Sequence, residues 1–295
     1  MADPKTYATV VSLGILCYDY FLTLPQEVNL IWSRRFTLGT LLFFVCRYLP
    51  FVDIPISLHV YTSTKLTAAG CHSLVIVCNS IQVVGIGTAE VILLLRTIAI
   101  WERNPYVIFG IVLLFLTSFG ASCVFTTLYL LTIQFSKSHA RACNAYNVHW
   151  IVLLDYVVIL VIETVVILLT LVKAIQHLRA STSSWLYHLY QRGLVYFIFI
   201  FITSLSNIII PVFAEDTNKL ALTDFQRVLH SVLCSRVILL ILQQKSEYDS
   251  RELRASHRAD TPILGRFVQT ALDLDSFMIP DEQYQQYHTE TLRIV

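Results

Sequence analysis

Six of the ionisable side chains inside the long apolar stretches of this 295-residue chain, where little water is available to solvate them, could do chemistry there. The six are Asp19, Arg47, Glu90, Asp155, Glu163 and Arg236. A charge at the centre of a bilayer costs about 2.5–3.5 kcal/mol on insertion scales, so such groups normally face the interior of a helix bundle and pair there. Asp155 lies near the end of its stretch, as does Arg96 of a neighbouring stretch, and both are expected to reach the interface. The other five predict a buried ion network.

The positions of these five charges along their stretches indicate which of them can meet. At a rise of about 1.5 Å per residue, Asp19 and Arg47 differ in depth by roughly 7 Å, within reach of an arginine side chain. Arg236 is expected near the level of Glu90 and Glu163. Such a network is either a switch or proton relay in the inner half of the bundle, or a static set of pairs that fixes helix packing. The spacing does not distinguish these two interpretations.

Seven apolar stretches must position these charges. Hydrophobic residues make up 56% of the chain and charged residues 14%, with a mean hydropathy of +0.64. A helix crosses the hydrocarbon core in about 20 residues, and without water its backbone must satisfy its own hydrogen bonds. The sequence therefore predicts an all-α bundle of seven transmembrane helices, residues 1–244, followed by a polar, largely disordered tail, residues 245–295. The predicted spans are 7–24, 37–54, 72–99, 106–130, 150–172, 193–213 and 223–242.

Lysine and arginine in the short connections predict the orientation of the bundle. With the N-terminus outside and the C-terminus cytoplasmic, eleven of these residues lie on the inner side and five on the outer side. An excess of positive charge inside is the usual pattern, so this orientation is favoured. We expect a multi-pass integral membrane protein, with the plasma membrane as the favoured location. The lipid bilayer is then its main partner.

Two of the seven cysteines fall outside the predicted spans. Cys71 lies at the outer end of the third helix, and Cys143 lies in the loop between the fourth and fifth helices. Both face the oxidising side in this orientation, where disulfides form and persist. We predict a disulfide between them, an arrangement that also ties the third helix to the second outer loop in seven-helix receptors. The other five cysteines read as small apolar residues within helices.

Several kinds of chemistry are not indicated by the sequence. A net charge of +1 and the lack of a Lys/Arg-rich run argue against nucleic acid binding. The nine histidines are scattered, and no metal-binding or nucleotide-binding motif is found. Gly85 and Gly87 lie within a predicted span and are expected to allow close helix contact. We expect no catalytic site, no metal and no cofactor, and therefore no enzyme.

The N-terminal block carries a recognisable pattern. Tyr18–Leu24 reads YDYFLTL and is followed by Glu27-Val28, Ile31-Trp32 and Arg47-Tyr48. This resembles a large family of multi-pass membrane proteins from mushroom-forming fungi, whose N-terminal domain carries a YDxxLTLxxEVxxIW…RY signature and is a domain of unknown function. Leu95–Trp101, which includes Arg96 at the inner end of the third helix, and Ser235–Leu239 extend the resemblance. It implies no role for the signature residues, which are Tyr18, Asp19, Glu27, Trp32, Arg47 and Tyr48.

The signature also makes physical sense without the family. Glu27 and Trp32, with the two arginines that follow, read as a short amphipathic connection at the inner interface. Asp19 and Arg47 flank this connection on adjacent helices. We therefore predict a hairpin of two helices held by an ion pair.

Three classes of function remain open. A receptor-like seven-helix sensor is favoured by the helix count, the orientation, the outer cysteine pair and the tail. It lacks a D-R-Y triplet at Arg96 and an N-P-x-x-Y sequence in the last helix. The alternatives are a membrane structural or adaptor protein, and a small-solute or ion transporter using the buried charges, although seven spans show no internal duplication. The candidate partners are a small ligand, from outside or within the bundle, and a cytoplasmic protein at the inner loops and tail.

Overall fold

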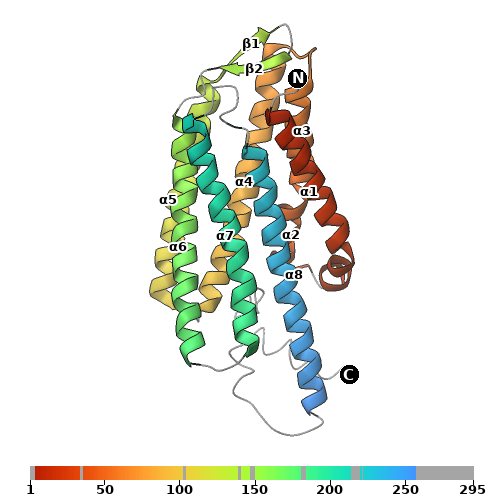
Figure 1. Ribbon diagram of the computed structural model, residues 1–295, viewed down its shortest axis with the longest axis vertical. Coiled ribbons are helices and arrows are strands. Elements are labelled where there is room, and N and C mark those ends of the chain that lie inside the picture. Colours follow the sequence, from red (N-terminus) through yellow and green to blue (C-terminus); the bar gives the residue numbers. More distant parts are fainter. Residues whose placement is uncertain are drawn as a thin grey trace.

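Long helices lying side by side dominate the structure (Figure 1). The computed structural model describes residues 4–33, 36–101, 104–138, 141–146, 150–180, 184–213, 220 and 222–256. The α-helices are α1 (Pro4–Glu27), α2 (Leu38–Tyr48), α3 (Pro50–Thr62), α4 (Ala68–Ile100), α5 (Pro105–Thr132), α6 (Ile151–Ala180), α7 (Ser184–Phe213) and α8 (Thr223–Ser256). A π-helix, η1 (Val28–Trp32), continues α1. Two strands, β1 (Gln134–Ser138) and β2 (Arg141–Tyr146), join α5 to α6.

Side-chain caps fix where two of the long helices begin. The hydroxyl of Thr67 accepts a hydrogen bond from the backbone N–H of Gly70 at the start of α4. The side chain of Asn104 accepts one from the N–H of Tyr106 at the start of α5, where Pro105 occupies the first helical position. The first N–H groups of a helix have no partner within it, and a proline there has no N–H to leave unpaired. These local signals place both helix starts within a few residues of the predicted spans.

The second predicted span is longer than expected and is divided by a proline. The prediction was one helix over residues 37–54, whereas α2 and α3 together extend to Thr62 and meet at Leu49. Pro50 has no N–H to donate to the preceding turn, so the hydrogen-bond pattern of α2 ends there. Leu49 keeps a helical backbone conformation, and the chain therefore continues in nearly helical form into α3.

Within the described residues, six helical segments are long and apolar enough to cross a membrane: Pro4–Trp32, Leu38–Thr62, Ala68–Ile100, Pro105–Thr132, Ile151–Gln176 and Thr223–Gln243. The apolar part of α7 within the described residues, Ile198–Phe213, is shorter. Large apolar side chains are exposed along the outer faces of these helices, among them Phe109 and Leu116 of α5. Water would solvate such a continuous apolar surface poorly, whereas lipid suits it.

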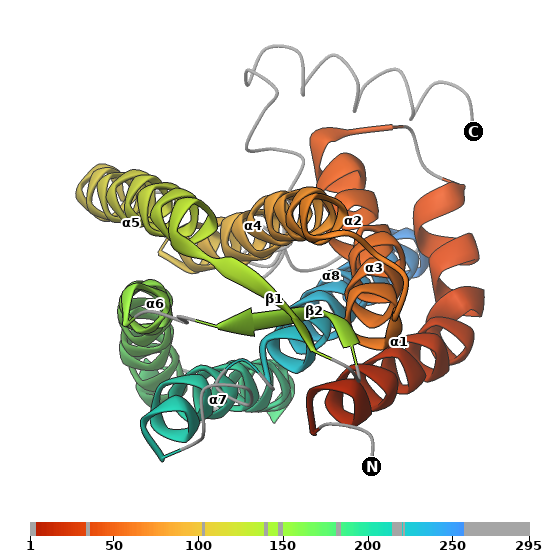
Figure 2. The same ribbon diagram turned by 90° about the horizontal axis from the view of Figure 1, so that it is seen from above.

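Two helices occupy the centre of the bundle. α4 contacts α2, α3, α5, α6 and α8, and α8 contacts α1, α2, α3, α4 and α7 (Figure 2). Most of the apolar window of each of these two helices is buried, in contrast to α5, which packs mainly against α4 and α6 and is the least covered of the candidate spans among the described residues. Polar residues on α4 and α8 therefore face other helices rather than lipid.

A β-hairpin interrupts the predicted all-α fold. β1 and β2 pair antiparallel, with Gln134 opposite Tyr146 and Phe135 opposite Ala145. The hairpin lies across the end of the bundle that also holds the start of α1 (Figures 1 and 2). The segment between α5 and α6 is too short and too polar to span a membrane, and antiparallel pairing supplies partners for its backbone groups. We call this the hairpin end of the bundle and the opposite end, where α8 finishes, the tail end.

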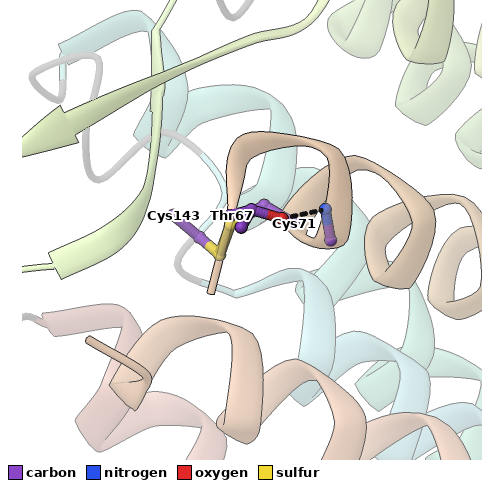
Figure 3. The surroundings of a disulfide bond; sticks show 4 residues. Thr67, Cys71 and Cys143 are labelled. Atoms are coloured by element: carbon purple, nitrogen blue, oxygen red, sulfur yellow. Dashed lines mark hydrogen bonds between the residues drawn. A yellow bond between two sulfur atoms is a disulfide. The ribbon is translucent and has the colours of Figure 1, made fainter. Parts of the chain in front are cut away.

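The predicted disulfide is present. The sulfur of Cys143 on β2 is bonded to that of Cys71 in the first turn of α4, with a Cα–Cα distance of 5.6 Å (Figure 3). In the same turn the N–H of Cys71 donates to the carbonyl of Thr67 at 2.9 Å. The bond therefore anchors the hairpin to a turn of α4 that its cap already holds. The described cysteines Cys17, Cys46, Cys78, Cys123 and Cys234 are free thiols.

Breaking this disulfide should destabilise the hairpin end. Replacing both Cys71 and Cys143 with serine is expected to lower stability by about 2–5 kcal/mol, because the cross-link closes a long segment of chain. Thermal unfolding of the purified protein measures the loss, and Cys123→Ser, at a half-buried free thiol, is the matched control. Peptide mapping without reduction should recover Cys71 and Cys143 in one linked peptide. Alkylation of both thiols in the unreduced protein would contradict the assignment.

The last helix continues past its predicted end. The final span was predicted to stop at residue 242, but α8 runs to Ser256 and so includes the first part of the segment predicted as a polar tail. The apolar part of this helix is Thr223–Gln243, in agreement with the predicted span, and α8 continues beyond it as a polar helix. Residues 257–295, and with them the prediction of a disordered tail, lie outside the described residues.

Candidate functional site

Arg47 is the centre of a buried polar group near the tail end, which we call the Arg47 cluster: Asp19, Thr23, Glu27, Arg47, Tyr48 and Arg236. The Arg47 side chain is only 3% exposed, and its Nε lies 2.6 Å from Glu27 Oε2. Its NH1 lies 3.6 Å from Asp19 Oδ2, and its NH2 donates to Thr23 Oγ1 at 2.6 Å. The predicted contact between Asp19 and Arg47 is therefore formed. A second carboxylate, Glu27, makes the shorter contact.

Further hydrogen-bond donors surround the two carboxylates of the Arg47 cluster. Tyr48 Oη and Trp32 Nε1 both donate to Glu27 Oε1, at 2.7 and 3.1 Å. Arg236 of α8 donates from Nε to Asp19 Oδ1 at 2.5 Å. Glu27 was predicted at the inner interface, but it is fully buried, because α1 continues into η1 and turns this side chain toward the bundle. The cluster thus joins α1, α2 and α8.

A second polar group, the Arg227 cluster, lies between α1, α3, α4 and α8 toward the hairpin end. Arg227 Nε donates to Asp53 Oδ2 at 3.0 Å, and both side chains are fully buried. Asp224, one turn earlier on α8, accepts hydrogen bonds from Thr9 Oγ1 at 2.7 Å and Gln82 Nε2 at 3.1 Å. Every contact in this cluster joins side chains of two different helices. Each carboxylate draws its partners from elsewhere in the bundle.

The glycines of α4 make room for side chains rather than for another helix backbone. A Cβ on Gly85 would overlap the guanidinium of Arg227. A Cβ on Gly87 would lie 2.7 Å from Cε2 of Phe119 on α5. The predicted close contacts at these glycines are therefore made with side chains of α8 and α5. Gly85 in particular admits the ion pair of the Arg227 cluster.

The third polar group is the glutamate–histidine triad of Glu90 on α4, Glu163 on α6 and His230 on α8. His230 Nε2 lies 3.1 Å from Glu163 Oε1, and His230 Nδ1 lies 3.9 Å from Glu90 Oε1. Ser204 of α7 donates to Glu163 Oε1 at 2.7 Å and accepts from Gln226 Nε2 at 2.8 Å. All three triad side chains are buried. The triad therefore sits in the interior, where four helices meet.

Two cavities lead toward the triad. One, of about 80 Å³, is lined by Tyr129, Tyr156 and Thr223 near the hairpin end. The other, of about 50 Å³, lies between α4, α5 and α6 and has Glu90 in its wall. Asp155 lines both cavities, together with Val83, Ile86 and Ile159. They therefore adjoin one another and place polar groups at intervals from the hairpin end to Glu90.

The structure distributes the predicted residues differently from the prediction. Instead of one network, Asp19, Arg47 and Arg236 belong to the Arg47 cluster, and Glu90 with Glu163 belongs to the triad. Arg236 lies too far along α8 to share the level of Glu90, because His230 occupies that position. Asp155 was expected to reach the interface, but its carboxyl group lines the cavities.

The remaining predicted residues flank these groups. Arg96 was also expected at the interface, but it is buried at 5% exposure, as are most residues of the second half of α4, from Ala89 to Ile100. Trp101 Nε1 donates to the carbonyl of Leu169 at 3.2 Å, and the ammonium group of Lys173 lies 5.5 Å from its ring centroid. Tyr18 is exposed on the outer face of α1 and takes no part in the Arg47 cluster.

Four buried residues escaped the sequence interpretation: Asp53, Asp224, Arg227 and His230. Asp53 and Asp224 fall at the ends of predicted spans, where a charge is unremarkable. Arg227 and His230 lie near the start of the last span, and histidine was searched for only in local metal motifs. A polar face was nevertheless present, since positions 224, 227 and 231 recur at helical spacing. That spacing is the signal that could have revealed Asp224 and Arg227.

Together these features define a class of protein, an integral multi-pass membrane protein with a polar interior. Residues 7–52 match a family of unknown function, DUF6533. No curated protein and no solved structure matches the chain. The matched segment contains Asp19, Thr23, Glu27, Arg47 and Tyr48, so it supplies every member of the Arg47 cluster except Arg236 of α8.

Proposed function

We propose that the protein is a receptor-like seven-helix sensor that binds a small ligand in the cavities beneath the hairpin. In this proposal α7 is the seventh spanning helix, and the N-terminus and hairpin face outside. The disulfide supports this orientation, because such bonds persist on the oxidising side of a membrane. A cytoplasmic partner would then meet the tail end. The proposal assigns no catalytic step to the chain.

The observation that carries the proposal is the placement of polar groups on α8. Asp224, Arg227, His230 and Arg236 each contact a different set of helices, from the hairpin end to the tail end. Thr223, beside Asp224, lines the larger cavity and bonds Tyr156 Oη at 2.6 Å. A ligand there touches the start of the helix whose later turns hold the triad and the Arg47 cluster. Movement of α8 is a physical route from one end to the other.

Ligand binding and its coupling to the tail end are the test. We expect a thermal-shift screen of small metabolites to find compounds that stabilise the purified chain, since binding at 100 times Kd contributes about 2.7 kcal/mol. Val83→Phe should abolish the shift by filling the wall that both cavities share. Val84→Phe is the matched control, because Val84 is 52% exposed and lines neither cavity. A fluorophore on Gln243→Cys, with Cys17 and Cys123 replaced by serine, should report the movement of α8.

Three outcomes would contradict the sensor. Compounds that stabilise Val83→Phe as strongly as the unaltered chain bind elsewhere. Binding without a change at position 243 indicates a protein that does not signal through α8, in agreement with a structural or adaptor role. If no compound in the screen stabilises the chain, the proposal of a small ligand is rejected.

A transporter is the second candidate, and one observation favours it. Among the described residues, neither oxygen of Glu90 and only one oxygen of Glu163 has a hydrogen-bond partner. Unpaired carboxylates in a membrane often mark an ion or proton path. Flux into proteoliposomes that is lost in Glu90→Gln would favour transport over sensing.

A further inference from the structure

The glutamate–histidine triad has the composition of a metal site. Glu90, Glu163 and His230 are 4%, 3% and 0% exposed and come from three different helices. One ligand atom from each lies within 4.8 Å of the other two. Imidazole nitrogen with carboxylate oxygen is a common ligand set for Zn²⁺, with bonds of about 2.0–2.2 Å. Mg²⁺ and Ca²⁺ prefer oxygen ligands alone, so the histidine favours a transition metal.

The charge of the triad also favours a bound cation. With both carboxylates ionised and the imidazole neutral, the triad would carry two negative charges in a region that excludes water, which is costly without a compensating cation. In the described part of the chain, the ion-pair contacts of Glu90 and Glu163 are with the imidazole of His230, which adds no positive charge while it is neutral. A divalent ion would neutralise both carboxylates at once.

The unpaired oxygens are the ones that a metal ion needs. Ser204 occupies Oε1 of Glu163 and leaves Oε2 without a hydrogen bond, and both oxygens of Glu90 are without one in the described part of the chain. Ser204 is fixed in turn by Gln226, and Gln226 by Asn207 at 2.7 Å. Such a second layer of hydrogen bonds commonly orients metal ligands. Glu90 makes no hydrogen bond with the described residues, so its carboxyl group could turn to close the distance to the ion.

The neighbouring cavity supplies an approach and an open position. Glu90 lies in the wall of the cavity of about 50 Å³, which has room for at least one water molecule. Three protein ligands around Zn²⁺ leave a fourth position for water or another small ligand. Asp155 lines the same cavity without belonging to the triad.

We propose that Glu90, Glu163 and His230 bind one divalent transition-metal ion, with Zn²⁺ the best match to the ligands, inside the helix bundle. The sequence hides this site because no two ligands share a helix, so no local motif exists. The site does not depend on the sensor proposal. A bound ion would join α4, α6 and α8 at the level where the cavities end.

Metal titration of the full-length purified chain tests the proposal. After treatment with EDTA and desalting, we expect the chain to take up one equivalent of Zn²⁺, measured by elemental analysis, and to unfold at a higher temperature. Co²⁺ should give the visible absorption of a four-coordinate site. X-ray absorption of the zinc form should show nitrogen and oxygen ligands only.

Isosteric variants identify the ligands. Glu90→Gln, Glu163→Gln and His230→Gln should each weaken Zn²⁺ binding more than tenfold, and Ser204→Ala by about tenfold through its effect on Glu163. Asp155→Asn and His72→Gln are the controls and should bind as the unaltered chain does. Retention of one equivalent in the Glu90→Gln, His230→Gln double variant, or sulfur in the zinc coordination shell, would overturn the assignment.

Folding of the variants does not limit the test. If a variant does not fold, the uptake, cobalt spectrum and ligand type of the unaltered chain still decide. Less than a tenth of an equivalent of Zn²⁺ in that chain would end the proposal. The metabolite screen is run in EDTA, so failure of the metal site leaves the sensor test unaffected.

Discussion

Arg47→Leu should be among the most destabilising single substitutions in the first two helices. The change removes the cation that pairs with Glu27 at 2.6 Å and with Asp19 at 3.6 Å, and it leaves two carboxylates in the bundle. Removing one partner of a buried ion pair typically costs about 3–5 kcal/mol. Folded yield by fluorescence-detected size exclusion, and the thermal midpoint of what folds, measure the loss.

The rescue of this variant depends on which carboxylate is neutralised. Asp19 keeps Arg236 as a partner at 2.5 Å, whereas Glu27 retains only the neutral donors of Tyr48 and Trp32 among the described residues. Glu27→Gln combined with Arg47→Leu should therefore recover more stability than Asp19→Asn combined with Arg47→Leu. Equal recovery by the two pairs would show that Glu27 is not the main partner of Arg47.

Arg236→Leu provides a graded comparison. Its side chain is 33% exposed, and Asp19 still has Arg47 within 3.6 Å when it is lost. The expected cost is smaller than that of Arg47→Leu, since a partly exposed ion pair contributes less than a buried one. An effect of equal size would indicate that α8, rather than the α1–α2 hairpin, determines the stability of the Arg47 cluster.

Hydropathy predicted the helices because lipid imposes a simple length requirement on each span. It did not predict how far a helix continues beyond its apolar part, as in the extension of α8 to Ser256. The break at Pro50 was visible in the sequence, but its effect on the second span depends on Leu49 keeping a helical conformation. The hairpin was missed because short polar strands give a weak periodic signal beside seven strong apolar ones.

The polar interior was predictable only where its partners are neighbours in sequence or depth. Asp19 and Arg47 lie on consecutive helices, so counting residues from a shared end was enough to pair them. The assignment of Arg236 to the level of Glu90 failed because His230, almost two turns earlier on α8, occupies that level. His230 could not be paired with Glu90 and Glu163 until the order of helices around α8 was known. Local sequence patterns predict the helices, whereas the buried ion pairs depend on which helices contact one another.

Gly85→Ala should destabilise the protein although alanine is normally the better helix former. A methyl group on Gly85 would occupy the space of the Arg227 guanidinium, which is fully buried and held by Asp53 at 3.0 Å. Overpacking of this kind costs about 1–3 kcal/mol, and displacement of Arg227 from Asp53 raises the cost toward about 3–5 kcal/mol. Gly120→Ala on α5 is the matched control, since its Cβ would meet nothing within 4 Å, and it should be neutral or stabilising.

The cause of the Gly85→Ala defect can be isolated by a double-mutant cycle. In a chain carrying Arg227→Met and Asp53→Asn, the guanidinium is gone and no carboxylate is left unpaired by its loss. Gly85→Ala should then be close to neutral, or stabilising by up to about 1 kcal/mol from helix propensity. Thermal unfolding of the single, double and triple variants gives the coupling. An undiminished cost in the background without Arg227 would mean that the glycine serves the packing of α4 itself, and that the ion pair at the centre of the bundle does not depend on it.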